Sequence, residues 1–179
     1  MSPTWSAEGI RQESTGWRDA WISQRHRAWG WDCAATDIDG IGTQDVLKAD
    51  TFLEYYHYQP VALFEYKTYG SLEQLGLDKV KRDHEPVKRL ATMAGIPSFI
   101  VGYDSQAVQF QVHPTNQVAQ DFAVGEWKFG DLPRTMSEER YVGLLYRLRG
   151  IKMPEDLRNR LAEASYHRTM GDSVEVEND

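Results

Sequence analysis

Residues 52–67 read Phe-Leu-Glu-Tyr-Tyr-His-Tyr-Gln-Pro-Val-Ala-Leu-Phe-Glu-Tyr-Lys, and this stretch decides the fold. Its aromatic and apolar residues are typical of strands. Two runs, 52–58 and 61–67, separated by a turn at Gln59-Pro60, predict a β-hairpin. The second run is apolar on both faces until it reaches Glu65, which is the pattern of a central strand covered on both sides.

The segments around this hairpin alternate between helical and strand patterns. Helices are predicted over 6–29, 86–94, 137–149 and from Pro154 onward, strands over 33–39, 98–103 and 107–113, and a short helix near 117–123. This order predicts an α/β (α+β) domain with a mixed central sheet of four to five strands flanked by helices, and with extra C-terminal helices. We expect a single domain over 1–170 and a disordered acidic tail over 171–179.

The composition is that of an acidic globular protein. The net charge is −7 and the pI is about 5.2, which argues against a protein that coats nucleic acid through its overall field. A metal ion can still supply positive charge locally where a phosphate binds. No apolar run has the length of a membrane helix, no secretory signal is recognised, and Cys33 is the only cysteine; we therefore expect a cytoplasmic protein without a membrane partner and without a disulfide.

Four charged residues lie at the ends of two predicted strands. Asp37 and Asp39 alternate along one strand, and Glu65 and Lys67 alternate along the other, so each pair shares one face of its strand. Ionic groups on buried strands are costly unless they pair or hold a metal. Two carboxylates and a backbone carbonyl suit Mg²⁺, which activates water and stabilises charge during phosphodiester hydrolysis, and a nearby lysine can orient or deprotonate that water.

An aspartate, a hairpin and Glu-x-Lys at the end of an apolar strand resemble the PD-(D/E)xK nuclease superfamily. Residues 60–67 and 90–103 are similar to small nuclease-like proteins encoded by bacteriophages, and the resemblance covers residues 6–113. It implies a restriction-endonuclease-like core and a Mg²⁺-dependent endonuclease acting on DNA, with Mn²⁺ as a substitute metal. For a phage-encoded protein it also implies the host cytoplasm.

The resemblance assigns roles to individual residues. Asp39, Glu65 and Lys67 would be catalytic, with Lys67 positioning the attacking water. The metal ligands would be Glu65, the carbonyl of Tyr66, and Asp39 or Asp37. Which aspartate is the ligand stays open, and Asp39 is preferred because it lies nearer the end of its strand.

The chain departs from the family pattern at two places. Thr36 stands where the family has proline, and residues 40–51 look like an insertion between the aspartate strand and the hairpin. Many members of the family add a glutamate from the first helix. Glu8 and Glu13 are the candidates for this role.

Five basic side chains are candidates for contact with nucleic acid: Arg25, His26, Arg27, Arg82 and His84. The first three adjoin tryptophans, a combination that suits a nucleic acid backbone and its bases. Basic residues at a helix end also suit the helix dipole, so both interpretations stay open. The last two follow the Glu-x-Lys strand, where the alternative is a solvated loop.

Other functions fit the same residues. A catalytically inactive nuclease-fold protein would bind nucleic acid or a protein partner, and a phage interaction protein would have no nucleic acid role. In a purely structural alternative, Asp39 pairs with Lys67 and Glu65 is solvated. A homodimer is also open, because many nucleases pair two sites and the C-terminal helices offer a surface for it.

Overall fold

The structure is a computed structural model that describes residues 4–5, 11–12, 20–33, 35–37, 50–106, 108–126 and 134–174. Its centre is a six-stranded sheet with the order β3-β4-β5-β6-β7-β8. The strands are β3 (Ala35–Asp37), β4 (Asp50–Tyr56), β5 (Gln59–Thr68), β6 (Ser98–Asp104), β7 (Gln109–Pro114) and β8 (Arg134–Ser137). β5 and β6 are parallel, and the other neighbours are antiparallel.

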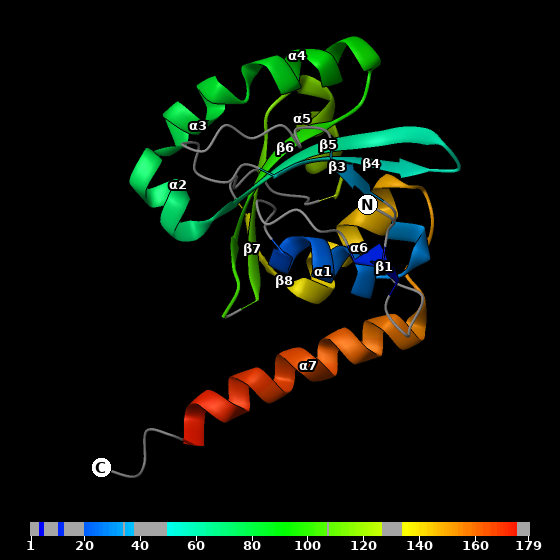
Figure 1. The fold of residues 1–179 in the computed structure, drawn as a ribbon, viewed down its shortest axis with the longest axis vertical. Helices are drawn as coiled ribbons and strands as arrows, with labels where there is room; N and C mark the ends of the chain where they lie inside the picture. The colour runs from blue at the N-terminus through cyan, green and yellow to red at the C-terminus, as the bar shows by residue number, and fades with distance from the viewer. Residues whose placement is uncertain are drawn as a thin grey trace.

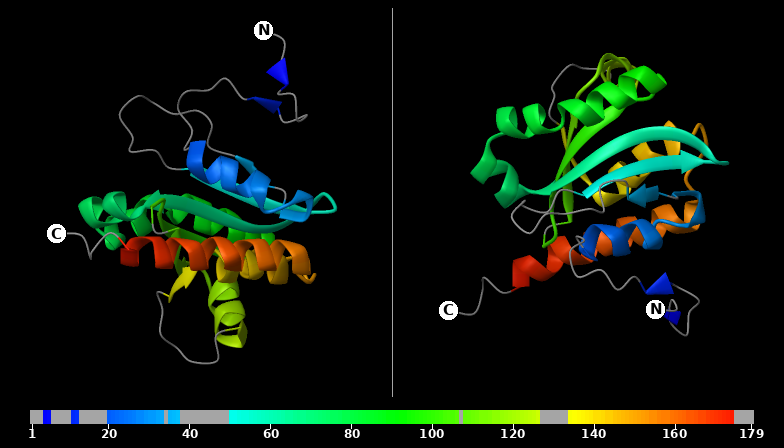
Figure 2. Two further views of the ribbon diagram at one scale, coloured as in Figure 1. Left: turned by 90° about the horizontal axis from the view of Figure 1, so that it is seen from below. Right: turned by 45° about the horizontal axis from the view of Figure 1, so that its top comes forward.

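Helices cover both faces of this sheet (Figure 1). They are α1 (Ala20–Ala28), the 3₁₀ helix η1 (Trp31–Cys33), α2 (Tyr69–Leu75), α3 (Leu77–Asp83), α4 (Glu85–Ala94), α5 (Gln117–Glu126), α6 (Glu138–Leu148) and α7 (Glu155–Val174). α2, α3 and α4 form an arc along one side, whereas α1, α6 and α7 lie on the other (Figures 1 and 2). None of the helices in the described ranges has the length and apolarity that crossing a membrane requires.

The two faces of β5 differ in character. Phe64 and Tyr66 belong to the larger apolar core, which α1, α5, α6 and α7 close. The alternate residues of β5 face the helical arc, where Leu72, Val80 and Ile100 form a smaller cluster. The mixed α+β architecture expected from the sequence is therefore confirmed. The expected four to five strands were too few, because β8 falls in a segment without a strand pattern.

The turn of the central hairpin lies two residues earlier than the sequence predicts. His57 and Tyr58 form it, both with positive φ (48° and 64°), which is the conformation of a type I′ hairpin turn. Gln59 and Pro60 instead begin β5. Pro60 is tolerated because β6 pairs with β5 only from Leu63 onward, so that ladder needs no N–H from position 60.

The N-terminal prediction was too long. Residues 4–5 (β1, Thr4–Trp5) pair antiparallel with residues 11–12 (β2, Arg11–Gln12), so a helix cannot run through them from Ser6. The helix begins at Ala20. The strand expected over 33–39 begins only at Ala35, because Trp31–Cys33 forms a 3₁₀ turn.

The later helices follow the sequence more closely. α4 ends at Gly95, whose φ of 68° caps it in the left-handed conformation. Residues 71–85, which carry no clear pattern, form most of α2 and α3, and Gly76 (φ 74°) separates these helices. α7 continues to Val174, past the predicted start of the tail at Gly171; residues 175–179 lie outside the described residues.

Candidate active site

Glu65 and Lys67 lie on the same face of β5, as alternation along the strand predicts. Nζ of Lys67 is 2.8 Å from Oε1 of Glu65. Each residue is only 5% exposed, because α2, α3 and α4 pack over this face. The pair therefore places a carboxylate and an ammonium group side by side at the end of the central strand, shielded from most of the solvent.

His84 is the second partner of Glu65. Its Nδ1 lies 2.6 Å from Oε2 of Glu65, and its Nε2 lies 2.8 Å from Oγ of Ser98. His84 occupies the junction between α3 and α4 and is fully buried. The imidazole that we considered for phosphate contact thus has both nitrogens engaged inside the protein, and in this position it supports Glu65.

Glu65 is held in its ionised form. Burial alone would raise the pKa of its carboxyl group, but the hydrogen bond from His84 and the charge and hydrogen bond of Lys67 outweigh burial, so the pKa is lowered. A carboxylate that stays ionised while buried is a hard oxygen donor, the kind of ligand that Mg²⁺ prefers.

Ser98, His84 and Glu65 form a chain that matches the hydroxyl, imidazole and carboxylate order of a hydrolase triad. The match is chemical only, because Ser98 is 0% exposed and no substrate carbonyl can reach it. Its backbone is also engaged, with its N–H donating to Asn116 and its carbonyl accepting from Thr115. Ser98 therefore orients His84, and we assign it no nucleophilic role.

Of the two predicted aspartates, Asp37 and Asp39, the structure describes only the backbone of Asp37. Asp39 lies outside the described residues, as do Glu8 and Glu13. Asp37 is the last residue of β3, two strands from β5, and its backbone is in register with Phe52, which is in register with Phe64. The Asp37 position thus belongs to the row of Phe52 and Phe64, whose side chains pack in the larger core on the face opposite Glu65.

A third aspartate, Asp50, was missed by sequence reasoning. It begins β4, and its backbone is in register with Tyr66, while the next residue, Thr51, is in register with Glu65. Position 50 falls within residues 40–51, which look like an insertion in the sequence, and no periodic pattern marks Asp50 as the start of a strand. The signal that could have found it is its place two residues before Phe52, the first aromatic residue of the hairpin.

The described residues fit part of a magnesium site. Among them, no group of three or more His, Cys, Asp or Glu side chains could hold a metal ion. Mg²⁺ is commonly bound through one or two carboxylates while it keeps several waters, and Glu65 supplies one ionised carboxylate. The backbone carbonyl of Tyr66 follows it in the chain. A second carboxylate would have to come from an aspartate outside the described side chains.

The basic residues expected at a nucleic acid surface divide into two groups. Arg25, which is half-buried, and His26, which is buried, lie on α1 beside the larger core, on the sheet face opposite Glu65. Arg25 Nε donates to Glu138 Oε1 at 2.7 Å, and His26 Nε2 lies 3.0 Å from the hydroxyl of Tyr66. Arg27 and Arg82 are exposed, as contact with a phosphate requires.

The hydrogen bond from His26 extends into a buried polar network. The Tyr66 hydroxyl also contacts that of Tyr141, and Arg149 donates to Glu54 nearby. Burial lowers the pKa of His26, against the opposing effect of Glu54, so the imidazole is neutral at pH 7. This network holds the side chain of Tyr66, the residue between Glu65 and Lys67, on the opposite face of β5.

Comparison with protein-family models, with curated proteins and with solved structures gave no match for this chain.

Proposed function

We propose that this protein is a Mg²⁺-dependent phosphodiesterase, an endonuclease acting on DNA, with a PD-(D/E)xK site formed by Asp39, Glu65 and Lys67. The observation that carries the proposal is the buried, ionised Glu65 with Lys67 Nζ at 2.8 Å on the central strand. Buried ion pairs are poor sources of stability, so their presence at a strand end favours a chemical role.

The arrangement of elements supports the same proposal. A helix (α1), three antiparallel strands (β3, β4, β5), a helical segment (α2, α3 and α4) and a strand parallel to the third (β6) occur in that order, with η1 between α1 and β3. The restriction-endonuclease-like core that the resemblance implies has a similar order, namely a helix, three strands, a helix and a strand. It brings the strand that carries Glu65 to the middle of the sheet.

In the proposed mechanism each residue has one role. Glu65 would hold the ion together with the carbonyl of Tyr66 and with Asp39, and Asp50 is a further candidate because it begins β4, the strand next to β5. The bound ion supplies charge stabilisation at the phosphate and lowers the pKa of water. Lys67 orients the attacking water.

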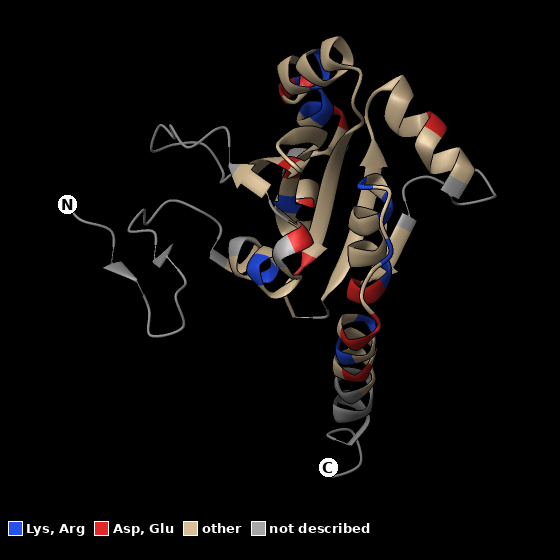
Figure 3. Ribbon diagram, turned by 90° about the vertical axis from the view of Figure 1, so that its right-hand side faces the viewer, with Lys and Arg blue, Asp and Glu red and all other residues tan. Residues whose placement is uncertain are grey.

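Charge along the helical arc suits a locally bound nucleic acid. Both basic and acidic residues occur along α3 and α4 (Figure 3). The exposed or half-buried basic side chains there are Lys79, Lys81, Arg82, Lys88 and Arg89. Lys88 and Arg89 pair with Glu85. The mixed signs allow contacts with a few phosphates and do not create a uniformly basic surface, in agreement with the net charge of −7.

The test is a cleavage assay with supercoiled, linear and branched DNA in Mg²⁺, in Mn²⁺ and in EDTA. The Lys67→Met variant should lose activity by about 100-fold or more, because water is no longer oriented. Lys152→Met, at an exposed position between α6 and α7, is the matched control and should cleave like the wild type. Cleavage in EDTA, or unchanged cleavage by Lys67→Met, would contradict the proposal.

A non-catalytic nuclease-fold protein is the second candidate. The observation that favours it is that both carboxylate oxygens of Glu65 already have partners, Lys67 and His84. This second candidate predicts DNA binding with a steep salt dependence, and no cleavage with any metal ion. Absence of both binding and cleavage would instead favour a protein partner. Sedimentation of the same samples would report a homodimer.

A further inference from the structure

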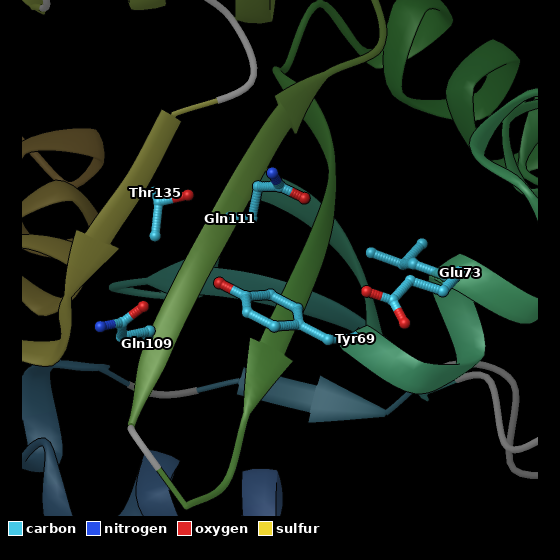
Figure 4. Close-up of a pocket in the computed structure, with 6 residues that line it drawn as sticks. Tyr69, Glu73, Gln109, Gln111 and Thr135 are labelled. Carbon is cyan, nitrogen blue, oxygen red and sulfur yellow. The ribbon is translucent and has the colours of Figure 1, made fainter.

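A cavity of about 280 Å³ opens between α2 and the strands β7 and β8. The described residues that line it are Tyr69, Leu72, Glu73, Gln109, Gln111 and Thr135. Figure 4 shows the ring of Tyr69 lying across the strands, with Gln109, Gln111 and Thr135 around its hydroxyl end and Glu73 on the opposite side. The cavity is on the face of the sheet that carries Glu65 and Lys67.

One cross-strand row connects this cavity to the proposed active site. Lys67 is in register with Gly102, Gly102 with Gln111, and Gln111 with Thr135. Adjacent strands are about 4.8 Å apart, so the backbone at Gln111 lies about 10 Å from that at Lys67. The cavity is therefore a close neighbour of the site on the same surface.

Gly102 allows α2 to close one side of the cavity. A Cβ atom at position 102 would lie 2.5 Å from Cδ1 of Leu72 and 3.2 Å from ring atoms of Tyr69. Only a residue without a side chain lets the helix approach the sheet so closely. This approach brings the Tyr69 ring over the strands, where it can stack against a planar ligand.

The lining offers hydrogen bonds and little charge. Burial and the nearby Lys81 lower the pKa of His113 to about 4, so His113 is neutral. Its Nε2 lies 3.1 Å from Oε1 of Gln111; when Nε2 carries the proton it donates to that oxygen and leaves the Gln111 amide nitrogen as a donor. The side chain of Glu73 is an acceptor. Among the described lining residues there is no cation, so the cavity suits a neutral group better than a phosphate.

We infer that this cavity receives an unpaired nucleobase from the DNA strand that is bound at Lys67. A nucleobase is planar and neutral, presents alternating donors and acceptors, and stacks on aromatic rings. Glu73 would accept from an exocyclic amino group. A paired base must first be unstacked, at a cost of a few kcal/mol. The substrate class is therefore DNA that already has an unpaired base, a conclusion that rests on the proposed nucleic acid substrate.

The test compares two duplexes that differ in one nucleotide. One carries an unpaired 2-aminopurine as a bulge, and the other is fully paired. Binding is measured by fluorescence anisotropy in EDTA, which prevents metal-dependent cleavage. The wild-type protein should bind the bulged duplex about 10-fold more tightly, an advantage that corresponds to 1.4 kcal/mol, and 2-aminopurine fluorescence should change on binding.

Two substitutions at one exposed position, Thr135, distinguish binding in the cavity from binding elsewhere on the surface. Thr135→Phe fills the cavity and should abolish the preference for the bulge, whereas Thr135→Val keeps the volume and should retain it. Gln109→Ala, also at an exposed position, is a second variant in case Thr135→Phe fails to fold by circular dichroism; it should reduce the preference.

Each outcome decides a different claim. Equal binding of both duplexes by the wild type, or an unchanged preference in folded Thr135→Phe and in Gln109→Ala, would overturn the inference. If Mg²⁺-dependent cleavage of paired DNA persists in that case, the proposed function stands without the base cavity. A Thr135-dependent preference without cleavage in any metal would support the cavity and overturn the nuclease.

Discussion

Nδ1 of His84 lies 2.6 Å from Oε2 of Glu65, and this contact joins the helical arc to the proposed active site. Glu65 therefore has two donors, Lys67 beside it on β5 and His84 above it. Only one of them, Lys67, is assigned to catalysis. His84 acts through Glu65, and Ser98 in turn fixes the ring of His84, so the chain from Ser98 to Glu65 is a positioning device.

Two substitutions at His84 distinguish its two contacts. In His84→Asn the amide nitrogen takes the place of Nδ1 and can still donate to Glu65, whereas in His84→Gln the amide takes the place of Nε2 and reaches only Ser98. We expect His84→Gln to lower Mg²⁺ affinity by about 10-fold or more, as loss of an outer partner does at other metal sites. His84→Asn should keep most of the affinity.

Thermal unfolding of the same variants gives the control. Each substitution leaves one buried partner of His84 without its hydrogen bond, so both should destabilise the fold by about 1–3 kcal/mol. Equal loss of Mg²⁺ affinity in the two variants would mean that the contact with Glu65 has no special role.

Gly102 makes the close packing of α2 on β6 possible. We expect Gly102→Ala to cost about 1–3 kcal/mol in the free energy of unfolding, because its Cβ would meet Leu72 and the ring of Tyr69. Adding Leu72→Ala should recover part of that loss by making room. Gly125→Ala, in α5 where a Cβ would meet nothing within 4 Å, should be neutral or stabilising by up to about 1 kcal/mol. Urea denaturation measures all three, and a harmless Gly102→Ala would disprove the packing argument.

His113 makes stability dependent on pH. Burial, and the charge of Lys81, lower its pKa from 6.5 to about 4 in the folded protein. Between these pH values the unfolded chain binds the extra proton, so the free energy of unfolding should fall as the pH is lowered from about 7 to 5. The contribution is on the order of 2 kcal/mol, and the lowered pKa of His26 acts in the same direction.

The check is urea denaturation of His113→Gln across this pH range. Its stability should vary less with pH than that of the wild type. His57→Asn is the matched control, because position 57 is exposed and asparagine accepts its positive φ; it should keep the wild-type pH dependence. An identical pH profile in wild type and His113→Gln would contradict the assignment.

The sequence predicted well those elements whose side chains repeat with one clear period. Val87 and Ala91 on α4, and Phe110 and Val112 on β7, marked a helix and a strand that the structure confirms. The same alternation placed Glu65 and Lys67 on one face. Local patterns of this kind are sufficient because the period of an element depends on its own residues alone.

Contacts between distant segments could not be read from the sequence. Nothing in the neighbourhood of His84 indicates that it meets Glu65, and the conformation of His57 and Tyr58 contradicts the preference for a turn at Gln59-Pro60. The burial of His26 is also a tertiary effect, since it depends on Tyr66, which lies 40 residues away in the chain. A basic residue beside tryptophans resembles a nucleic acid contact until the partner inside the core is known.

The central claim is that Glu65 holds a divalent ion. The most direct test measures Mn²⁺ binding from the electron paramagnetic resonance signal of the Mn²⁺ that stays free in solution. The wild type should bind Mn²⁺ at a site that is lost in Glu65→Gln and retained in Glu85→Gln, the same change at a more exposed carboxylate one residue after His84. Equal binding by wild type and Glu65→Gln, or no binding by the wild type, would contradict the account.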